Sequence, residues 1–194
     1  MERAARFARS VILKGVSPTQ QFPDVRAFER LDDHYIKASG RPVRLDYAVN
    51  PLPPGVEALA VYDEGRDRLL VAVSPETYRG LQAGYPRARF CLCHEIGHAC
   101  LHGEQLVRLG RIPHQRAVSM LRGKAEHPRY RDTEWQANAF AGALLMPAVG
   151  LAELESAGGV LTASRLQRVY GVSAHAAQIR LQVFTQRRRE LLAA

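Results

Sequence analysis

The pentapeptide His94-Glu95-Ile96-Gly97-His98 is the stretch of this 194-residue chain that best indicates its fold and its chemistry. Residues four apart lie on one face of an α-helix, so the imidazoles of His94 and His98 can bind one metal ion together. Glu95, which follows the first histidine, can then act on a water molecule at that metal. The spacing predicts a zinc hydrolase site, with a helix that carries two ordinary solvated histidines as the alternative.

A catalytic zinc site usually takes three protein ligands and keeps one position for water, so a third ligand is required. The metzincin pattern would place glycine and histidine at positions that are Leu101 and Glu104 here, so it is absent. His102 lies four residues after His98, but it is displaced around the helix from the line that joins His94 and His98. We expect His102 to support a ligand, or to lie at the edge of the core, rather than to bind metal.

Glu134 is the favoured third ligand. It lies at the start of a predicted helix over residues 133–146, with Asn138 four residues later on the same face. The carboxylate can reach a metal while the polar side chain of Asn138 orients a ligand histidine. A glutamate in a first helical turn is also favourable to the helix dipole without any metal. Position alone therefore leaves the role of Glu134 open.

Two segments carry a resemblance to a known family. Residues 89–102 read RFCLCHEIGHACLH, and residues 134–147 read EWQANAFAGALLMP. In this order they closely resemble the ImmA/IrrE family of metallopeptidases, which typically reads H-E-x-G-H-x-x-x-H and then E-x-E-A-N/D-x-F-A-x-x-L-L-M-P. The resemblance implies that Glu134 is the third metal ligand. The chain departs from the pattern at Gln136, where the family often has a second glutamate, and amides are weak zinc ligands.

The resemblance implies a zinc-dependent, site-specific endopeptidase. Its expected substrate is a helix-turn-helix repressor protein, usually encoded beside it, whose cleavage derepresses stress or mobile-element genes. In this mechanism His94, His98 and Glu134 hold Zn²⁺, which lowers the pKa of a water molecule towards about 7 and polarises the scissile carbonyl. Glu95 takes the proton as general base and passes it to the leaving amine. Three residues between the motifs offer oxyanion stabilisation but are equally ordinary loop residues, so none is assigned: His114, His127 and Tyr130.

The remaining pattern predicts an α+β fold that resembles zincin metallopeptidases, with a small sheet packed on the metal-motif helix. We expect strands over residues 43–49, 56–62 and 69–73, with the last two joined as a hairpin. We expect helices over residues 2–14, 25–39, 87–101 and 133–146, a short helix near 118–122, and another after the N-cap Ser74. Gly40 and Gly103 are predicted helix ends, and Thr133 with Gln136 forms a capping-box pattern. Gly97 is expected to permit close approach of another backbone.

The C-terminal part of the chain is predicted to be a helical subdomain over residues 151–194, beside a peptidase domain over residues 1–150. Two helices around the turn at Gly171 give it the outline of a helix-turn-helix. The second helix offers few side chains for reading DNA: His175, Gln178, Arg180 and Gln182. We therefore favour packing or partner docking, with weak DNA association as a further expectation.

Composition sets the broad class. The formal net charge of +8 favours an acidic partner or proximity to nucleic acid. The alternative is that it only reflects an arginine-rich surface of a soluble protein. Cys91, Cys93 and Cys100 are too few and too close together for a disulfide framework, so a reducing cytoplasm fits better. Cys91 shares the face of the ligand histidines and is either a thiolate that shields the metal or, preferably, a small buried side chain. No secretory signal or membrane span is visible, so we expect no association with membranes.

Two alternatives to the peptidase remain. One is a DNA-binding regulator with a structural metal site, and the other is a toxin–antitoxin-like protein that acts by binding its partner. Glu95 favours the peptidase, because a purely structural metal site needs no general base.

Overall fold

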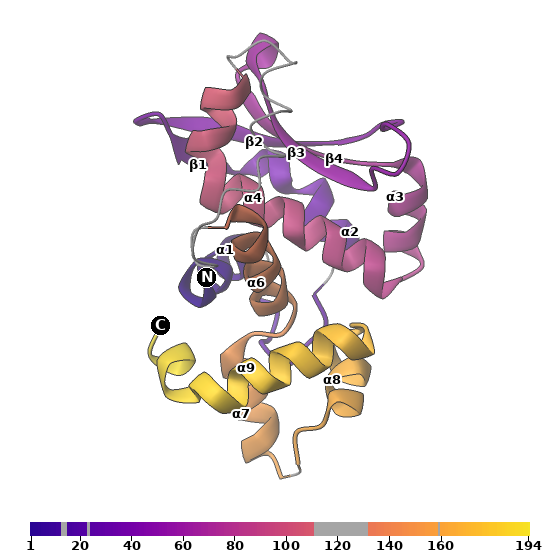
Figure 1. The fold of residues 1–194 in the computed structure, drawn as a ribbon, viewed down its shortest axis with the longest axis vertical. Coiled ribbons are helices and arrows are strands. Elements are labelled where there is room, and N and C mark those ends of the chain that lie inside the picture. The colour runs from indigo at the N-terminus through magenta and orange to yellow at the C-terminus, as the bar shows by residue number, and fades with distance from the viewer. Residues whose placement is uncertain (13–14, 23, 111–131, 159) are drawn as a thin grey trace.

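The fold is described by a computed structural model, which covers residues 1–12, 15–22, 24–110, 132–158 and 160–194 (Figure 1). The fold is of the α+β class, as predicted. The first half contains α1 (Glu2–Ile12), α2 (Asp24–Glu29), η1 (Leu31–Asp33), β1 (Tyr35–Ala38), β2 (Arg41–Val49), β3 (Ala58–Asp63), η2 (Glu64–Arg66) and β4 (Arg68–Val73). The second half contains α3 (Pro75–Gln82), α4 (Pro86–Gly110), α6 (Thr133–Leu145), α7 (Ala148–Ser156), α8 (Ala163–Tyr170) and α9 (Ala174–Ala193).

The four strands form one mixed sheet in the order β1-β2-β4-β3. The central strands β2 and β4 are parallel, with Leu45 opposite Leu69, whereas both outer pairs are antiparallel. In β2 the buried Val43 and Leu45 alternate with less buried residues, whereas β4 is a continuous apolar run buried on both faces at Val71, Ala72 and Val73. Helix α4 packs against this sheet so closely that a Cβ at Gly103 would lie 3.2 Å from both Ile36 and Leu69. Figure 1 shows α4 running beneath the sheet.

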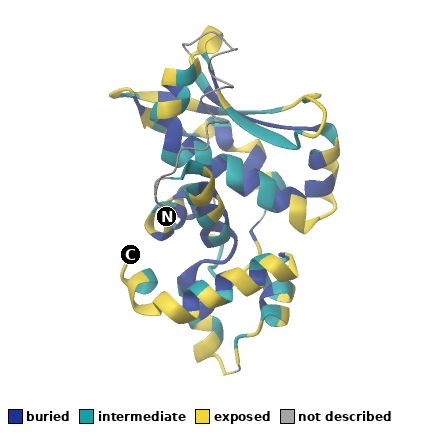
Figure 2. Ribbon diagram, viewed as in Figure 1, coloured by how far each residue is buried: buried dark blue, intermediate teal, exposed yellow. Residues whose placement is uncertain are grey.

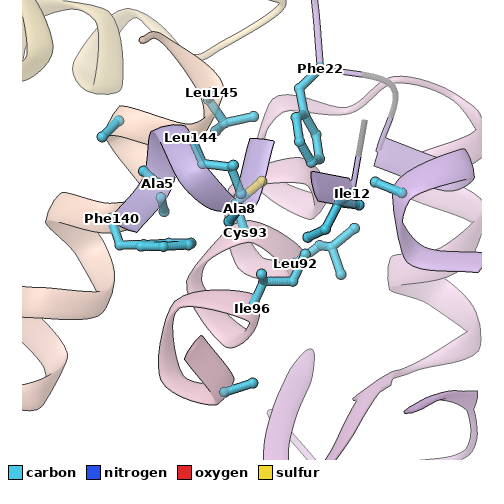
Figure 3. Packing of buried hydrophobic residues seen from close by; sticks show 14 of the residues in the cluster. Ala5, Ala8, Ile12, Phe22, Leu92, Cys93, Ile96, Phe140, Leu144 and Leu145 are labelled. Atoms are coloured by element: carbon cyan, nitrogen blue, oxygen red, sulfur yellow. The ribbon is translucent and has the colours of Figure 1, made fainter. Parts of the chain in front are cut away.

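The core lies where α1, α4 and α6 meet. Side chains that recur once per helical turn, with an adjacent residue on α4 and on α6, form a buried stripe on each helix (Figure 3): Ala5, Ala8 and Ile12; Leu92, Cys93 and Ile96; Phe140, Leu144 and Leu145. Helices α6 and α7 together contain a stretch, Thr133–Ser156, that is long and apolar enough to cross a membrane. The most apolar part of that stretch is mostly buried within the fold (Figure 2), as in core helices of soluble proteins.

Two buried arginines tie the N-terminal helix to the end of α6. Arg9 donates a 2.8 Å hydrogen bond to the carbonyl of Leu144, and Arg180 donates one of 2.8 Å to the carbonyl of Met146. Arg180 also pairs with the buried carboxylate of Glu2 at 2.8 Å. The last carbonyls of a helix have no partner within the helix, so these side chains satisfy groups that burial would otherwise leave unpaired.

The turn between α8 and α9 packs on the start of α4 through Arg89, whose side chain is fully buried. Its guanidinium donates to the carbonyls of Phe22, Tyr170 and Gly171 and pairs with Asp24. Gly171 ends α8 in the left-handed conformation, with φ of 61°. The two C-terminal helices are present as predicted, and the end of α8 contacts the helix of the metal motif, while the subdomain boundary at residue 150 stays a prediction.

The predicted helix over residues 25–39 is wrong. Its sequence forms α2, η1 and then β1, which pairs antiparallel with β2 so that Ile36 lies opposite Val43. Ser39 and Gly40 join these strands with φ of 52° and 78°. Two positive φ values in a two-residue turn suit the twist of a β-hairpin, so Gly40 marks a hairpin turn and not a helix end.

Of two other predicted helix boundaries, one is confirmed in part and one is wrong. Helix α4 continues past Gly103 to Gly110, but a kink at His102 (φ −119°, ψ 16°) divides it, so the helical segment with the metal motif ends at residue 101 as predicted. Helix α6 is capped by Asp132, whose carboxylate accepts from the backbone N–H of Glu134 at 2.9 Å, rather than by a capping box from Thr133. The hairpin of β3 and β4 and the N-cap at Ser74 are confirmed. The helix expected near residues 118–122 lies outside the described residues.

Candidate metal centre

Helices α4 and α6 bring the three predicted ligands together. The Nε2 atoms of His94 and His98 lie 3.0 Å apart. The carboxylate oxygens of Glu134 each lie 3.3 Å from one of these nitrogens. One donor atom from each residue falls within 4.8 Å of the other two, which is compact enough for a single metal ion.

The chemistry and spacing of these atoms fit a divalent metal. Two imidazole nitrogens and one carboxylate oxygen are a common ligand set of catalytic zinc. Ligands at about 2.0–2.1 Å from a tetrahedral zinc ion lie about 3.3 Å from one another, close to the spacings found here. The histidine side chains are largely buried, whereas the side chain of Glu134 is 64 % exposed. The site therefore opens to solvent on the side of α6.

A glycine contact sets the separation of the two helices. A Cβ at Gly97 would lie 3.0 Å from the ring of Phe140 and 3.3 Å from the backbone of Ala137. The backbone of α4 thus approaches α6 between the two histidines, which confirms the expectation for Gly97. This contact brings Glu134 within reach of His94 and His98.

Each histidine of the centre has its own partner at Nδ1. The Nδ1 of His94 lies 3.0 Å from Oδ1 of Asn138, and the Nδ1 of His98 lies 3.1 Å from Nδ1 of His102. A hydrogen bond at Nδ1 fixes a ring so that Nε2 points at the metal position. The structure therefore places both residues that were expected to support the ligands against the histidines.

Gln136 is a member of this cluster that sequence reasoning did not assign to the site. Its Oε1 lies 3.0 Å from Nε2 of His102, which the kink in α4 turns towards α6. The signal in the sequence is the departure from the family pattern at this position. Periodicity could not reveal the contact, because it joins two helices through residues that are 34 apart in the chain.

The electrostatics of the cluster favour a charged carboxylate beside the imidazoles. A hydrogen bond from His94 holds the pKa of Glu134 far below its usual range, and the neighbouring imidazole of His98 acts in the same direction. Burial opposes protonation of His94, but the hydrogen bond to Glu134 and the charge of Glu95 outweigh it and raise the pKa of His94. Burial lowers the pKa of His102, which favours its neutral form.

Glu95, the predicted general base, is on α4 beside the histidines. Burial raises the pKa of this carboxyl group, although the nearby His94 and His98 act in the opposite direction. The backbone N–H of Ala60, on the outer strand β3, donates a hydrogen bond to the carboxylate. Its raised pKa makes Glu95 a better proton acceptor than an exposed glutamate.

Cys91 does not direct its thiol at the metal position. Its Sγ donates to Oε2 of Glu57 at 3.4 Å, and Arg87 pairs with the same carboxylate at 2.7 Å. Burial and the charge of Glu57 raise the pKa of Cys91 to about 12, so it remains a neutral thiol. This counts against the metal-shielding thiolate, and Cys91 is a partly buried, neutral thiol. The three candidates for oxyanion stabilisation lie outside the described residues: His114, His127 and Tyr130.

Comparison with known families supports the resemblance carried by the two motifs. The model of the IrrE N-terminal-like domain, a peptidase family, matches residues 84–182, just over half of the chain. This range contains α4, α6 and both C-terminal helices up to residue 182 of α9. No curated protein matches the chain. By this match, the chain belongs to the ImmA/IrrE family of metallopeptidases.

Proposed function

We propose that the protein is a zinc-dependent, site-specific endopeptidase of the cytoplasm. Its substrate in this proposal is a helix-turn-helix repressor, whose cleavage derepresses stress or mobile-element genes. The observation that carries the proposal is the convergence of His94, His98 and Glu134 on one point, with Glu95 partly buried beside them. The arrangement provides three ligands and a general base, as the hydrolysis of a peptide bond at a zinc site requires.

Zinc bound at this position supplies a Lewis acid and brings the pKa of a water molecule towards about 7. Glu95 accepts the proton of the attacking water and donates it to the nitrogen of the leaving amine. Asn138 and His102 hold the ligand rings, so the metal position does not shift as charge develops. The exposure of Glu134 leaves the site accessible to a polypeptide substrate.

The choice of a repressor as substrate rests on the family resemblance. Its support from the fold is indirect: two helices, α8 and α9, lie at the C-terminal end, and Arg89 of α4 binds the carbonyls of Tyr170 and Gly171 at the end of α8. Arg180, one of the few DNA-reading candidates on α9, is buried against Glu2 and unavailable to DNA. This favours packing or partner docking over DNA binding for the C-terminal helices.

The alternative is a regulator that binds its partner and uses the metal only to stabilise its fold. Zinc content and cleavage separate the two functions. We expect about one zinc ion per chain in the wild type and in Glu95→Gln, and clear loss of zinc in Glu134→Ala. Glu95→Gln should cleave the repressor encoded beside the gene at least about 100-fold more slowly, because the general base is gone.

The matched control is Glu64→Gln, an exposed glutamate of the turn before β4. It should retain zinc and cleavage. Undiminished cleavage by Glu95→Gln would remove Glu95 from the mechanism. A wild type that takes up no zinc after reconstitution would favour the partner-binding alternative.

A further inference from the structure

A chain of polar contacts leads away from the metal position. It runs from Nδ1 of His98 to Nδ1 of His102 over 3.1 Å, and from Nε2 of His102 to Oε1 of Gln136 over 3.0 Å. His102 is only 6 % exposed, so its ring nitrogens depend on these protein partners. Each contact therefore restricts where the hydrogens of the two imidazoles can lie.

The direction of these hydrogen bonds follows from the last atom in the series of contacts, the amide oxygen of Gln136. An amide oxygen accepts only, so Nε2 of His102 carries the hydrogen. A neutral imidazole has one N–H, and Nδ1 of His102 is then an acceptor. Nδ1 of His98 must donate to it, which leaves the lone pair of its Nε2 directed at His94 and Glu134.

We propose that Gln136 is a positioning residue that sets the tautomer of His98 through His102. The proposal rests on the proposed function only for its consequence, which is that the lone pair on Nε2 of His98 is available to a metal. If the amide of Gln136 pointed its NH₂ group at His102, every hydrogen bond would reverse. His98 would then present an N–H at the metal position, where a ligand must have a lone pair.

His94 does not share this support. Its Nδ1 donates to Asn138, so its tautomer is fixed by a different side chain of α6. The two histidines therefore respond separately to substitutions on α6, and His94 is an internal control for His98. A glutamate at position 136 would accept the same hydrogen from His102 and add a negative charge. Glutamine accepts that hydrogen, and so sets the direction of both hydrogen bonds, without adding a charge.

The test is the ¹⁵N spectrum of the histidine rings in the metal-free, full-length protein at about pH 8, where unperturbed imidazoles are neutral. We expect Nδ1–H on His98 and Nε2–H on His102 in the wild type and in Gln136→Glu. Gln136→Leu, which removes the acceptor, should give mixed tautomers of His98 and leave His94 unchanged. Zinc affinity, measured by competition with a chromogenic chelator, should fall about 10- to 100-fold in Gln136→Leu and be largely restored in Gln136→Glu.

Gln186→Leu, at an exposed position of α9, is the matched control and should change neither measurement. An Nε2–H tautomer of His98 in the wild type would overturn the proposal, even if Gln136→Leu failed to fold. So would unchanged tautomers and affinity in a folded Gln136→Leu. The expected tautomers in a wild type that binds no zinc would instead sustain the role of Gln136 and count against the proposed function.

Discussion

Arg89, on the helix of the metal motif, donates a 2.8 Å hydrogen bond to the backbone carbonyl of Tyr170, 81 residues further along the chain. The same guanidinium neutralises Asp24, which is also buried. Arg89→Met should lower the free energy of unfolding by about 3–5 kcal/mol, because it leaves a buried carboxylate and several carbonyls without a donor. Urea unfolding measures this change. The exposed Arg79→Met should stay within about 0.5 kcal/mol of the wild type, and an equally small effect of Arg89→Met would contradict the structure.

Gly97 and Gly142 give opposite predictions for the same substitution. Alanine at Gly97 would press its Cβ against Phe140 and the backbone of Ala137, so we expect a loss of about 1–3 kcal/mol in stability. A Cβ at Gly142, inside α6, would meet nothing within 4 Å, and alanine there should add up to about 1 kcal/mol through helix propensity. Chemical denaturation of both alanine variants measures their free energies of unfolding relative to the wild type. Equal effects would show that the two helices do not meet at Gly97.

Asp132 caps α6, and its neighbour Thr133 does not. Asp132→Ala removes the acceptor for the backbone N–H of Glu134 and should cost about 0.5–2 kcal/mol. Asp132→Ser should recover most of that loss. Thr133→Ala should have a much smaller effect on thermal unfolding. If Thr133→Ala lowered the thermal stability more than Asp132→Ala, the capping box that the sequence pattern suggested would be correct after all.

Asp46 gives a pH-dependent contribution to stability. Burial opposes its ionisation, but hydrogen bonds from Arg68 and the backbone of Tyr47 outweigh it and lower its pKa in the folded state. A lowered pKa stabilises the fold above the unfolded-state pKa, near about 4, and this stabilisation disappears as the pH falls through the folded-state value. Asp46→Asn should therefore cost about 1–2 kcal/mol at about pH 7 and progressively less below about pH 4. Urea unfolding at several pH values measures the difference in free energy of unfolding between the wild type and Asp46→Asn. A difference that stays constant across this pH range would exclude the ion pair as its cause.

The local features of the site could be predicted from the sequence, because they depend on spacing within one helix. His94, Glu95 and His98 are close through the period of α4 alone, and Asn138 follows Glu134 by one turn of α6. The role of Gln136 depends on a contact between helices and on the kink at His102, neither of which has a periodic signal.

The errors in the fold have the same origin. The residues of β1 are extended only because they pair with β2, and glycine marks both helix ends and hairpin turns, so the sequence alone favours a helix there. Gly103 resembles a helix end in the sequence, although its small size serves the packing of α4 on Ile36 and Leu69. A glycine in a sequence shows that space or conformation is needed, but only the folded chain shows which.

The contact at Gly97 also bears on how such a site can change over evolutionary time. The spacing of the two helices depends on the ring of Phe140 and the backbone of Ala137, neither of which belongs to the side chains that face the histidines. Side chains that face the histidines, such as the one at position 136, are therefore free to vary in charge while the distance across the centre is kept. Architecture and reactivity at this centre therefore depend on different positions of α6, because one set of atoms sets the distance between the helices and another acts on the histidine rings.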